Sequence, residues 1–358
     1  MSFKNEDNYK FYNPRDVSAI LFKVVKKIGE YQWNAKRREE RRKDWNYKSE
    51  GFTKNPSLIF GRLIPYAVGK DENENKGKYL EFVVREFNEF ISETNIQNSL
   101  IKRHESTIKI LLEQGYKKET FLSTLQWRMV IGLGASHPQE TSMTLHHIYG
   151  IPYIPGSAIK GATRHYKIWQ IFEEIFNDPS EDDFKQIHCL EKLLENADLT
   201  NKDESKRDDR LNFEEFKKKF KVKKKKDDET IDVFPSKKLF EFLTTKQDKI
   251  IEFQKIFGTQ KKKGELIFFD AYPVGDINLK LDVMTPHYGP YYSEGKPPAD
   301  YHSPNPIKFL TVEKTKFRFS LVSKDKNLLE KTKDWLMVSL KNFGIGAKTA
   351  IGYGYFEP

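Results

Sequence analysis

The chain has 358 residues and a formal net charge of +10, with a sequence pI near 9.2. Its single cysteine, Cys189, excludes a disulfide framework and any zinc site built from several cysteines. Residues 1–15 do not resemble a signal peptide, and no apolar run reaches the ~18 residues that a membrane helix needs, so we expect a cytoplasmic protein with no membrane contact. The basic surplus favours an acidic partner, most often nucleic acid.

The first third of the chain is predicted to be helical. Apolar residues follow the helical repeat over 17–28, 79–91 and 100–112, so we expect an N-terminal helical region over residues 1–118. Between the first two helices, the basic cluster from Lys36 to Lys43 is flanked by aromatic residues, which can stack on unpaired bases. Because acidic residues dilute this cluster, a solvent-facing helix with internal ion pairs is the more ordinary interpretation.

The pattern changes near Glu119 from helical repeats to alternation. Residues 121–133 predict a strand, and a long loop then leads to a helix for which Ser157 is the expected N-cap. The later predicted elements are two strands, a strand or hairpin, a helix and a closing strand, over 265–274, 280–284, 307–322, 328–343 and the last residues. This β-α-β-β-α-β order is that of a ferredoxin-like unit, which the RNA-recognition motif also uses. We therefore expect an α+β fold with its main domain over residues 119–358.

Residues 178–263 interrupt this domain with a sharp change in composition. Of the 30 residues from Asn201 to Thr230, 21 are charged, and lysines dominate from Lys217 to Lys226. A segment so rich in charge is not expected to bury a core of its own. We therefore predict an exposed and partly disordered insertion, whose lysines could add nonspecific affinity for RNA.

The glycine-rich C-terminal segment, GIGAKTAIGYGYFEP from Gly344, is the first that could bind phosphate. Glycines let backbone N–H groups approach a phosphate closely, and Lys348 adds positive charge. A nucleotide-binding P-loop is excluded, because Ala347 precedes the lysine where a P-loop has glycine, and the nine residues after Thr349 are too few for the helix that follows a P-loop. The alternative without a ligand is a glycine-rich turn before a closing strand.

The second such segment is PGSAIKGATR, from Pro155 to Arg164. The N-terminus of a helix offers free N–H groups and the positive end of the helix dipole, which together attract anions. Lys160 and Arg164 lie one helical turn apart and add charge on one side. Taken alone, the segment is also typical of an ordinary capped helix in which Gly161 admits a close neighbour.

Together the two segments resemble the signatures of the RAMP superfamily of CRISPR proteins. IPYIPGSAIKGATR resembles the glycine-lysine helix signature, and GIGAKTAIGYGYF resembles the glycine-rich C-terminal loop, in the order and spacing of that family. Four further short motifs resemble those of subunits of Cmr (type III-B) effector complexes: Glu140-Thr141, HHIYGIPYIP, FDAYP and DVMTPHY. The resemblance covers residues 121–356, apart from the insertion.

The resemblance implies a noncatalytic RNA-binding scaffold subunit of a ribonucleoprotein complex for antiviral defence, with no cofactor or metal. Such a subunit holds the 3′ part of the CRISPR RNA and its target RNA. It contacts other Cmr-type subunits, namely the repeated backbone RAMP subunit and a neighbouring RAMP subunit. Phosphate contacts would make it indifferent to guide sequence. The residues that the analogy assigns to RNA binding are Ser157, Lys160, Gly161, Arg164, Gly346, Ala347, Lys348, Thr349 and His137.

Histidines in and after the long loop leave an alternative function open. They are His137, His146, His147 and His165. A metal-independent endoribonuclease that matures CRISPR RNA could use one of them as general base against the 2′-hydroxyl. Histidines that pack or form hydrogen bonds within a structured loop are the more ordinary interpretation. Because adjacent side chains on an extended segment point apart, we expect His146 and His147 to form no metal site. Asp270 and Asp282 are expected to hold loops together. A nonspecific RNA-binding protein outside CRISPR systems is a third hypothesis.

Overall fold

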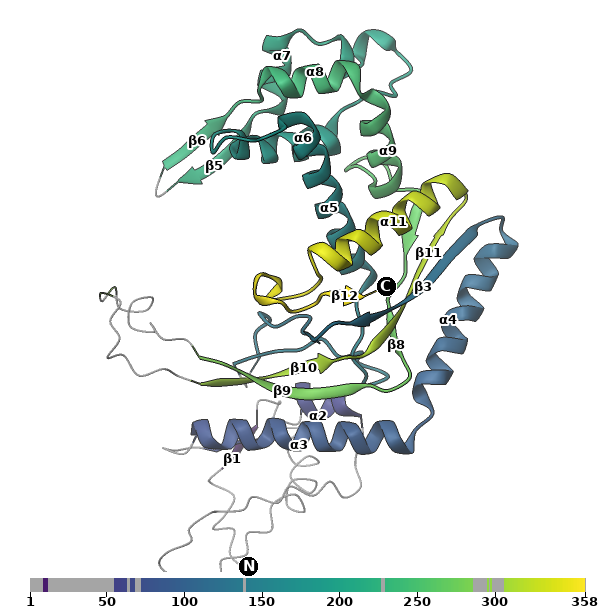
Figure 1. Cartoon of the computed structure of the whole chain (residues 1–358), viewed down its shortest axis with the longest axis vertical. Coiled ribbons are helices and arrows are strands. Elements are labelled where there is room, and N and C mark those ends of the chain that lie inside the picture. Colours follow the sequence, from purple (N-terminus) through teal and green to yellow (C-terminus); the bar gives the residue numbers. More distant parts are fainter. Residues whose placement is uncertain are drawn as a thin grey trace, which may run out of the picture.

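The computed structural model describes residues 9–11, 55–62, 65–67, 72–137, 140–226, 229–285, 295, 297 and 306–357. The predicted helix over 17–28 and the cluster from Lys36 to Lys43 lie outside the described residues. Figure 1 shows a helical insertion at one end of the molecule, sheets in the middle and the long helix α3 (Glu72–Glu93) at the other end. None of the described helices is long and apolar enough to cross a membrane.

The main sheet has the strand order β12, β3, β11, β7, and β8 pairs with the other end of β11. Its strands pair antiparallel. Their bounds are β3 Lys117–Leu125, β7 Leu266–Phe268, β8 Tyr272–Val274, β11 Lys316–Ser323 and β12 Phe356–Glu357. The α+β prediction is confirmed. Strands β3 and β11, which come from the predicted segments 121–133 and 307–322, lie in the centre of the sheet, an order compatible with the ferredoxin-like arrangement.

Helices α5 (Gly156–Phe176) and α11 (Lys326–Asn342) cover one face of this sheet. On that face Phe121 stacks on Phe319, and Lys333 of α11 binds Glu119 of β3 at 2.9 Å. Because side chains alternate along a strand, Arg318 lies on the opposite face. There its Nη1 binds Glu105 of helix α4 (Ile96–Glu113) at 2.5 Å, so α4 covers the second face.

A second, three-stranded sheet has the order β4, β10, β9. Its strands are β4 Arg128–Met129, β9 Asn278–Met284 and β10 Ile307–Glu313. The predicted strand over 121–133 is therefore two strands, because the chain leaves the main sheet after β3 and joins the second sheet as β4. Helix α3 packs on β9 and β10, where Lys308 binds Glu81 at 2.8 Å. Helix α2 (Pro56–Arg62) contacts α3, and β1 (Tyr9–Phe11) pairs with β2 (Pro65–Ala67).

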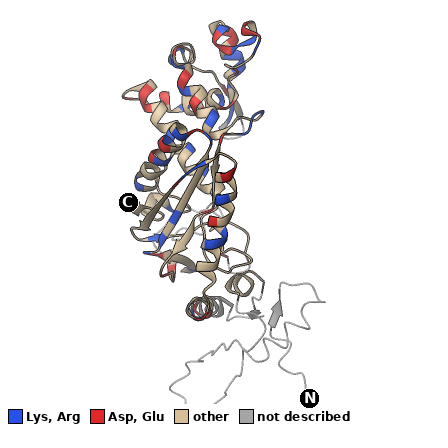
Figure 2. Ribbon diagram, turned by 90° about the vertical axis from the view of Figure 1, so that its right-hand side faces the viewer, with Lys and Arg blue, Asp and Glu red and all other residues tan. Residues whose placement is uncertain are grey.

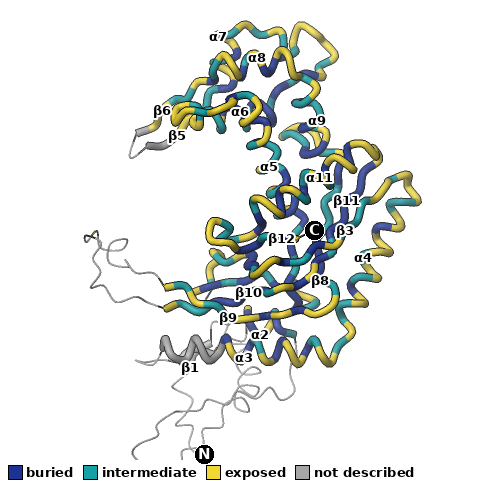
Figure 3. Tube along the Cα trace, viewed as in Figure 1, coloured by how far each residue is buried: buried dark blue, intermediate teal, exposed yellow. Residues whose placement is uncertain are grey.

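The charged insertion, residues 178–263, is built mainly of short helices (Figure 1). Its elements are η2 Asp183–Gln186, α6 Ile187–Asn196, η3 Glu204–Lys206, η4 Asp208–Arg210, α7 Phe213–Phe220, β5 Val222–Lys226, β6 Glu229–Val233, α8 Lys237–Thr245 and α9 Gln247–Phe257. Buried and exposed residues follow one another along these helices, as Figure 3 shows. Leu190, Phe216, Leu239 and Phe253 are fully buried.

The prediction that this insertion buries no core is therefore wrong for its described residues. Its apolar residues are few, but they recur at helical spacing, as Phe216 and Phe220 do on α7, so each short helix has one apolar face. Acidic and basic residues are interspersed along the insertion (Figure 2), and several of them pair. The boundaries at residues 118 and 119 and at 178 and 263 stay a prediction.

Candidate nucleic-acid interface

Helix α5 begins directly against the link between β7 and β8. Its first residue is Gly156 and its N-cap is Pro155, so the prediction of Ser157 as N-cap is wrong. The N–H of Gly156 instead donates to Oδ1 of Asp270 at 2.7 Å, and Asp270 holds the local structure as expected. A Cβ at position 156 would lie 2.2 Å from the carbonyl oxygen of Phe268. Glycine is therefore required here, and Ser157 is left exposed on the first turn.

The predicted contact residues further along α5 have different surroundings. Lys160 is half-buried, and burial together with the nearby Arg164 lowers its pKa. Gly161 is exposed, and a Cβ there would meet nothing within 4 Å. Arg164 binds Glu195 of α6 at 2.6 Å and Glu191 at 3.6 Å. Gly161 is thus exposed and Lys160 half-buried, whereas Arg164 forms ion pairs with α6 of the insertion.

The glycine-rich loop, defined as residues 344–354, folds back onto β4 through backbone hydrogen bonds. The N–H of Ala347 donates to the carbonyl of Val130 at 2.9 Å, and the N–H of Gly354 donates to the carbonyl of Arg128 at 2.7 Å. These bonds fix the loop at both of its ends against the start of the second sheet.

Two glycines allow this close approach. Gly346 and Gly354 have φ values of 100° and 77°, which residues other than glycine rarely adopt. A Cβ at position 346 would lie 2.5 Å from the carbonyl oxygen of Val130, and one at 354 would lie 2.0 Å from that of Ile345. The glycines are therefore explained by the fold itself, with or without a ligand.

Lys348 occupies the middle of the loop in the left-handed conformation, with φ 63°. Its Nζ lies 5.5 Å from the ring centroid of Phe309 on β10. Lys348 and Lys160 form no ion pair with any residue in the described part of the chain. Thr349 opens the short helix η5 (Thr349–Ile351). The loop therefore carries one positive charge that no carboxylate neutralises among these residues.

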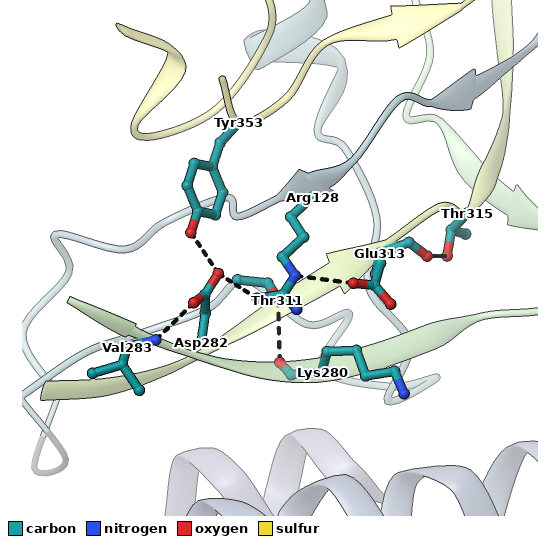
Figure 4. Close-up of polar contacts among 8 residues, drawn as sticks. All are labelled: Arg128, Lys280, Asp282, Val283, Thr311, Glu313, Thr315 and Tyr353. Atoms are coloured by element: carbon teal, nitrogen blue, oxygen red, sulfur yellow. Dashed lines mark hydrogen bonds and ion pairs between the residues drawn. The ribbon is translucent and has the colours of Figure 1, made fainter. Parts of the chain in front are cut away.

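A polar network lies beside the loop (Figure 4). Arg128 binds Asp282 of β9 at 2.5 Å and Glu313 of β10 at 3.0 Å, and the hydroxyl of Tyr353 donates to Asp282 at 2.5 Å. Burial by itself would raise the pKa of Asp282, but the hydrogen bonds from Tyr353 and Arg128 outweigh it and hold that pKa below its usual value. Burial and the bond to Asp282 raise the pKa of Tyr353 to about 12. Asp282 thus holds three segments together.

Helix α11 connects the glycine-rich loop to α5. The ring of Phe343, the last residue before the loop, makes edge contacts with His165 and Tyr166 of α5 at 5.8 Å. Ser339 Oγ donates to the carbonyl of Ala162 at 3.0 Å. The pairing of the two helices therefore brings the two signature segments, far apart in the sequence, to the same part of the fold.

The loop histidines are engaged in packing. His137 stacks on Phe60 at 4.3 Å, with Nε2 3.1 Å from the Phe60 carbonyl, and burial lowers its pKa. His146 Nδ1 accepts from the N–H groups of Ile148 and Tyr149 at 3.3 and 3.4 Å.

The rings of His146 and His147 stack at 5.2 Å. The expectation that these side chains point apart is wrong, because a turn rather than an extended segment follows His146. Within the described ranges, no group of His, Cys, Asp and Glu is placed to hold a metal ion.

The sequence patterns assigned no role to Arg128, Tyr353 or their neighbour Trp127. The one signal that could have identified Trp127 and Arg128 is the break in the alternation of residues 121–133, where they follow the polar Gln126. The partners of Arg128 come from β9 and β10, far away in the sequence, so spacing alone could not have identified the network.

The family model of the RAMP superfamily matches residues 124–357, which include α5, the insertion and the glycine-rich loop. The chain therefore belongs to the RAMP superfamily, and the resemblance seen in its two signature segments is confirmed.

Within this class the chain is similar to Cmr6. It is 39% identical over 243 residues to the CRISPR system Cmr subunit Cmr6 of Pyrococcus furiosus, covering 64% of each chain. It is 36% identical over 107 residues to Cmr6 of Saccharolobus solfataricus, covering 29% of this chain and 36% of that relative. The matches thus span less than two thirds of either relative.

Two solved structures are also similar. The cryo-EM structure of a type III-B Cmr-beta complex bound to cognate target RNA has a TM-score of 0.49 and 21% identity, covering 80% of this chain and 72% of that chain. The crystal structure of Cmr6 from Pyrococcus furiosus has a TM-score of 0.39 and 35% identity, covering 68% of this chain and 97% of that chain.

Proposed function

We propose that this protein is a noncatalytic RNA-binding subunit of a type III-B CRISPR effector complex, where it holds the 3′ part of the CRISPR RNA and its target RNA. The observation that carries the proposal is the glycine-rich loop, which is fixed on β4 with the charge of Lys348 unpaired among the described residues. The sequence relatives, both named as Cmr6 subunits, support it.

The proposed contacts are to phosphates rather than to base edges. Lys348 and the half-buried Lys160 supply positive charge, and exposed Ser157 and Gly161 leave the first turns of α5 open to a close neighbour. Phosphate contacts carry no sequence information, which suits a subunit that must accept every guide. Gly346, Ala347 and Thr349 would line the RNA from the loop backbone.

Two residues that the family analogy assigns to RNA have a supporting role in this proposal. Arg164 is neutralised by Glu191 and Glu195, and we infer that it docks the insertion on α5. His137 packs on Phe60, and we infer that it orders the long loop.

A binding measurement with single-stranded RNA tests the proposal. Changing Lys160 or Lys348 to alanine should weaken binding of the full chain, and each change should flatten the dependence of log K on log salt by about one. Lys246→Ala is the matched control, because this exposed lysine lies at the junction of α8 and α9 in the insertion. Equal affinity and salt dependence in all variants would refute the proposed site.

The proposed partners are other Cmr-type subunits, namely the repeated backbone RAMP subunit and a neighbouring RAMP subunit. Co-expression of the chain with those subunits and a CRISPR RNA should yield a complex that co-purifies through a tag on this chain. If no Cmr-type subunit is recovered, the assembly part of the proposal fails, whatever the RNA affinity of the isolated chain.

The noncatalytic part of the proposal has its own test against the endoribonuclease alternative. Nδ1 of His146 accepts two backbone hydrogen bonds, which leaves the ring proton on Nε2 and no free lone pair for a general base. His137 is stacked on Phe60, with Nε2 at hydrogen-bond distance from the Phe60 carbonyl. From these two environments we expect that incubation with precursor repeat RNA in the absence of metal leaves the RNA intact. Cleavage that disappears in His137→Ala or His146→Ala would establish the enzyme instead.

A further inference from the structure

We propose that Trp127 is a stacking platform for one unpaired RNA base, next to the phosphate contacts of the glycine-rich loop. The inference rests on the proposed function and extends it from phosphates to a base. No family signature segment includes Trp127, and it does not belong to the residues that the sequence assigns to RNA.

The backbone of Trp127 is fixed on both sides. It lies between β3 and β4, where its carbonyl accepts from the N–H of Lys314 at 2.9 Å. The preceding residue, Gln126, donates its N–H to the carbonyl of Tyr355 at 3.0 Å. A ring on such a rigid support loses little freedom when a base stacks on it, which favours binding.

The side chain of Trp127 is held in place but is not covered. Its ring lies 4.8 Å from that of Tyr353, and the guanidinium of Arg128 lies 5.4 Å from the ring centroid. Asp282 and Glu313 fix Arg128, and Asp282 also fixes Tyr353. Even so, Trp127 remains 42% exposed. A large aromatic ring is therefore presented to solvent by a network of half-buried polar groups that holds its neighbours in place.

A single exposed apolar residue is ordinary, but this one continues a row of rings that starts at the loop lysine. The Nζ of Lys348 lies 5.5 Å from the Phe309 ring, Phe309 lies 6.1 Å from Tyr353, and Tyr353 lies 4.8 Å from Trp127. The two inner rings, Phe309 and Tyr353, are buried, so the row has Lys348 at one end and the exposed ring of Trp127 at the other. Proteins that bind single-stranded RNA combine cations, which bind the phosphates, with aromatic rings, which stack on the bases. Stacking accepts all four bases, so it agrees with indifference to the guide sequence.

The test compares two probes of equal length, a short oligoadenylate and the same ribose-phosphate chain without bases. Both carry the same charge, so only stacking distinguishes them. With the full chain, Trp127→Ala should weaken oligoadenylate binding by about 5- to 150-fold and leave binding of the baseless probe unchanged. Trp127→Phe should retain most of the preference. Leu122→Ala removes another exposed apolar side chain, from β3, and serves as the matched control.

A spectroscopic readout keeps the test independent of folding defects. A fluorescent adenine analogue in the oligoadenylate should be quenched by the wild-type protein and not by Trp127→Ala, while the salt dependence of binding stays that of the wild type. Lys348→Ala should do the opposite, with a flatter salt dependence and quenching retained at saturation.

Three outcomes would overturn the inference, and they differ from a failure of the proposed function. A wild-type chain that binds both probes equally refutes stacking alone. If Trp127→Ala weakens the binding of both probes equally, the ring contributes to folding. If the variant keeps its preference for the probe with bases but no longer co-purifies with another subunit, the ring belongs to a protein interface. A wild-type chain that binds neither probe refutes the proposed function.

Discussion

The charged insertion and the glycine-rich loop are the two regions that charge and composition single out, and they use charge in opposite ways. In the insertion, 21 of the 30 residues from 201 to 230 are charged, yet Lys217, Lys219 and Lys221 pair with nearby carboxylates. The loop has one lysine, Lys348, which has no such partner among the residues that the structure describes. The number of charges in a segment therefore says little about where an anion binds. What matters is whether the fold has already neutralised them.

The regions also differ in what holds them. The insertion is held by the apolar faces of several short helices, so we expect it to tolerate the loss of any one surface charge. The loop is held by a few backbone hydrogen bonds that only glycine permits. The two regions should therefore respond differently to substitution.

Gly354→Ala should have the largest effect, because its Cβ would lie 2.0 Å from the Ile345 carbonyl oxygen at a φ of 77°. We expect a loss of about 3 to 5 kcal/mol in the free energy of unfolding. Denaturant unfolding measures it. Gly352→Ala is the control, since φ is 95° there but nothing lies within 4 Å. Its cost should be only the ~1 to 2 kcal/mol of the left-handed backbone. Equal costs for the two variants would show that the loop is not held tightly on β4.

Asp208→Ala should destabilise the insertion and spare the loop. Asp208 is 1% exposed, accepts from the N–H of Asp198 at 2.7 Å and binds Lys219. Its removal leaves these donors unpaired, at a cost of about 2 to 4 kcal/mol. Hydrogen exchange should show faster opening of α6 and α7, with single-stranded RNA affinity unchanged. Asp182→Ala breaks an exposed pair with Lys185 and should have a far smaller effect. If Asp208→Ala also weakened RNA binding, the prediction would be wrong, because the insertion and the loop would then be energetically coupled.

The network beside the loop should make stability depend on pH at both extremes. The pKa of Asp282 is lowered in the native state, so its contribution is present above about 4 and is lost as pH falls through the native pKa. The pKa of Tyr353 is raised to about 12, so its contribution is present below the unfolded value of about 10 and is lost as pH rises toward 12.

Unfolding measured across pH tests both directions with separate variants. Asp282→Asn should flatten the acid side of the profile, and Tyr353→Phe should flatten the alkaline side at a cost of about 1 to 2 kcal/mol near neutral pH. Asp276→Asn, which removes an exposed carboxylate outside the network, is the control. If the three profiles coincide with that of the wild type, the network does not contribute to stability.

Gly161→Ala should have the smallest effect on stability. This variant distinguishes a structural role of Gly161 from a role in RNA binding. A Cβ there meets nothing within 4 Å, and the residue lies inside α5, so Gly161→Ala should stabilise the fold by about 0.5 to 1 kcal/mol. If RNA approaches α5 closely at this point, the same variant should bind single-stranded RNA more weakly. Thermal unfolding and a binding titration on one sample decide the matter. A stabilised variant with unchanged RNA affinity would remove Gly161 from the proposed contacts.

Long helices with a regular apolar stripe were the part of the fold that the sequence predicted well. The expected helices over 79–91 and 100–112 lie within α3 and α4, and the one over 328–343 coincides with α11 except for its last residue. They could be predicted because their buried positions recur at helical spacing. The predicted strand over 121–133 was wrong in its extent, since β3 and β4 pair with different strands, β11 and β10. Local alternation gives no information about which sheet a residue joins.

The insertion and the binding surface show the same limit. The number of charged residues over 201–230 gave no information about the spacing of Phe216 and Phe220. These two buried residues form the apolar face through which α7 packs. Helical spacing placed Arg164 beside Lys160, but Glu195, which neutralises Arg164, lies on a different helix. The surroundings of a charge depend on which distant segment the fold brings against it. A single sequence does not show which distant segments come into contact.

The sequence alone was sufficient to assign the class of this protein, because each of its two glycine-rich signatures is a short contiguous segment that can be identified without knowledge of the fold. The contacts that require glycine at Gly156 and Gly346 come from distant segments, at Phe268 and Val130. The tertiary structure alone decided the environment of the charged and aromatic groups. It paired the lysines of the insertion, engaged Arg164 and left Trp127 exposed beside the loop, because ion pairing and burial depend on neighbours in space.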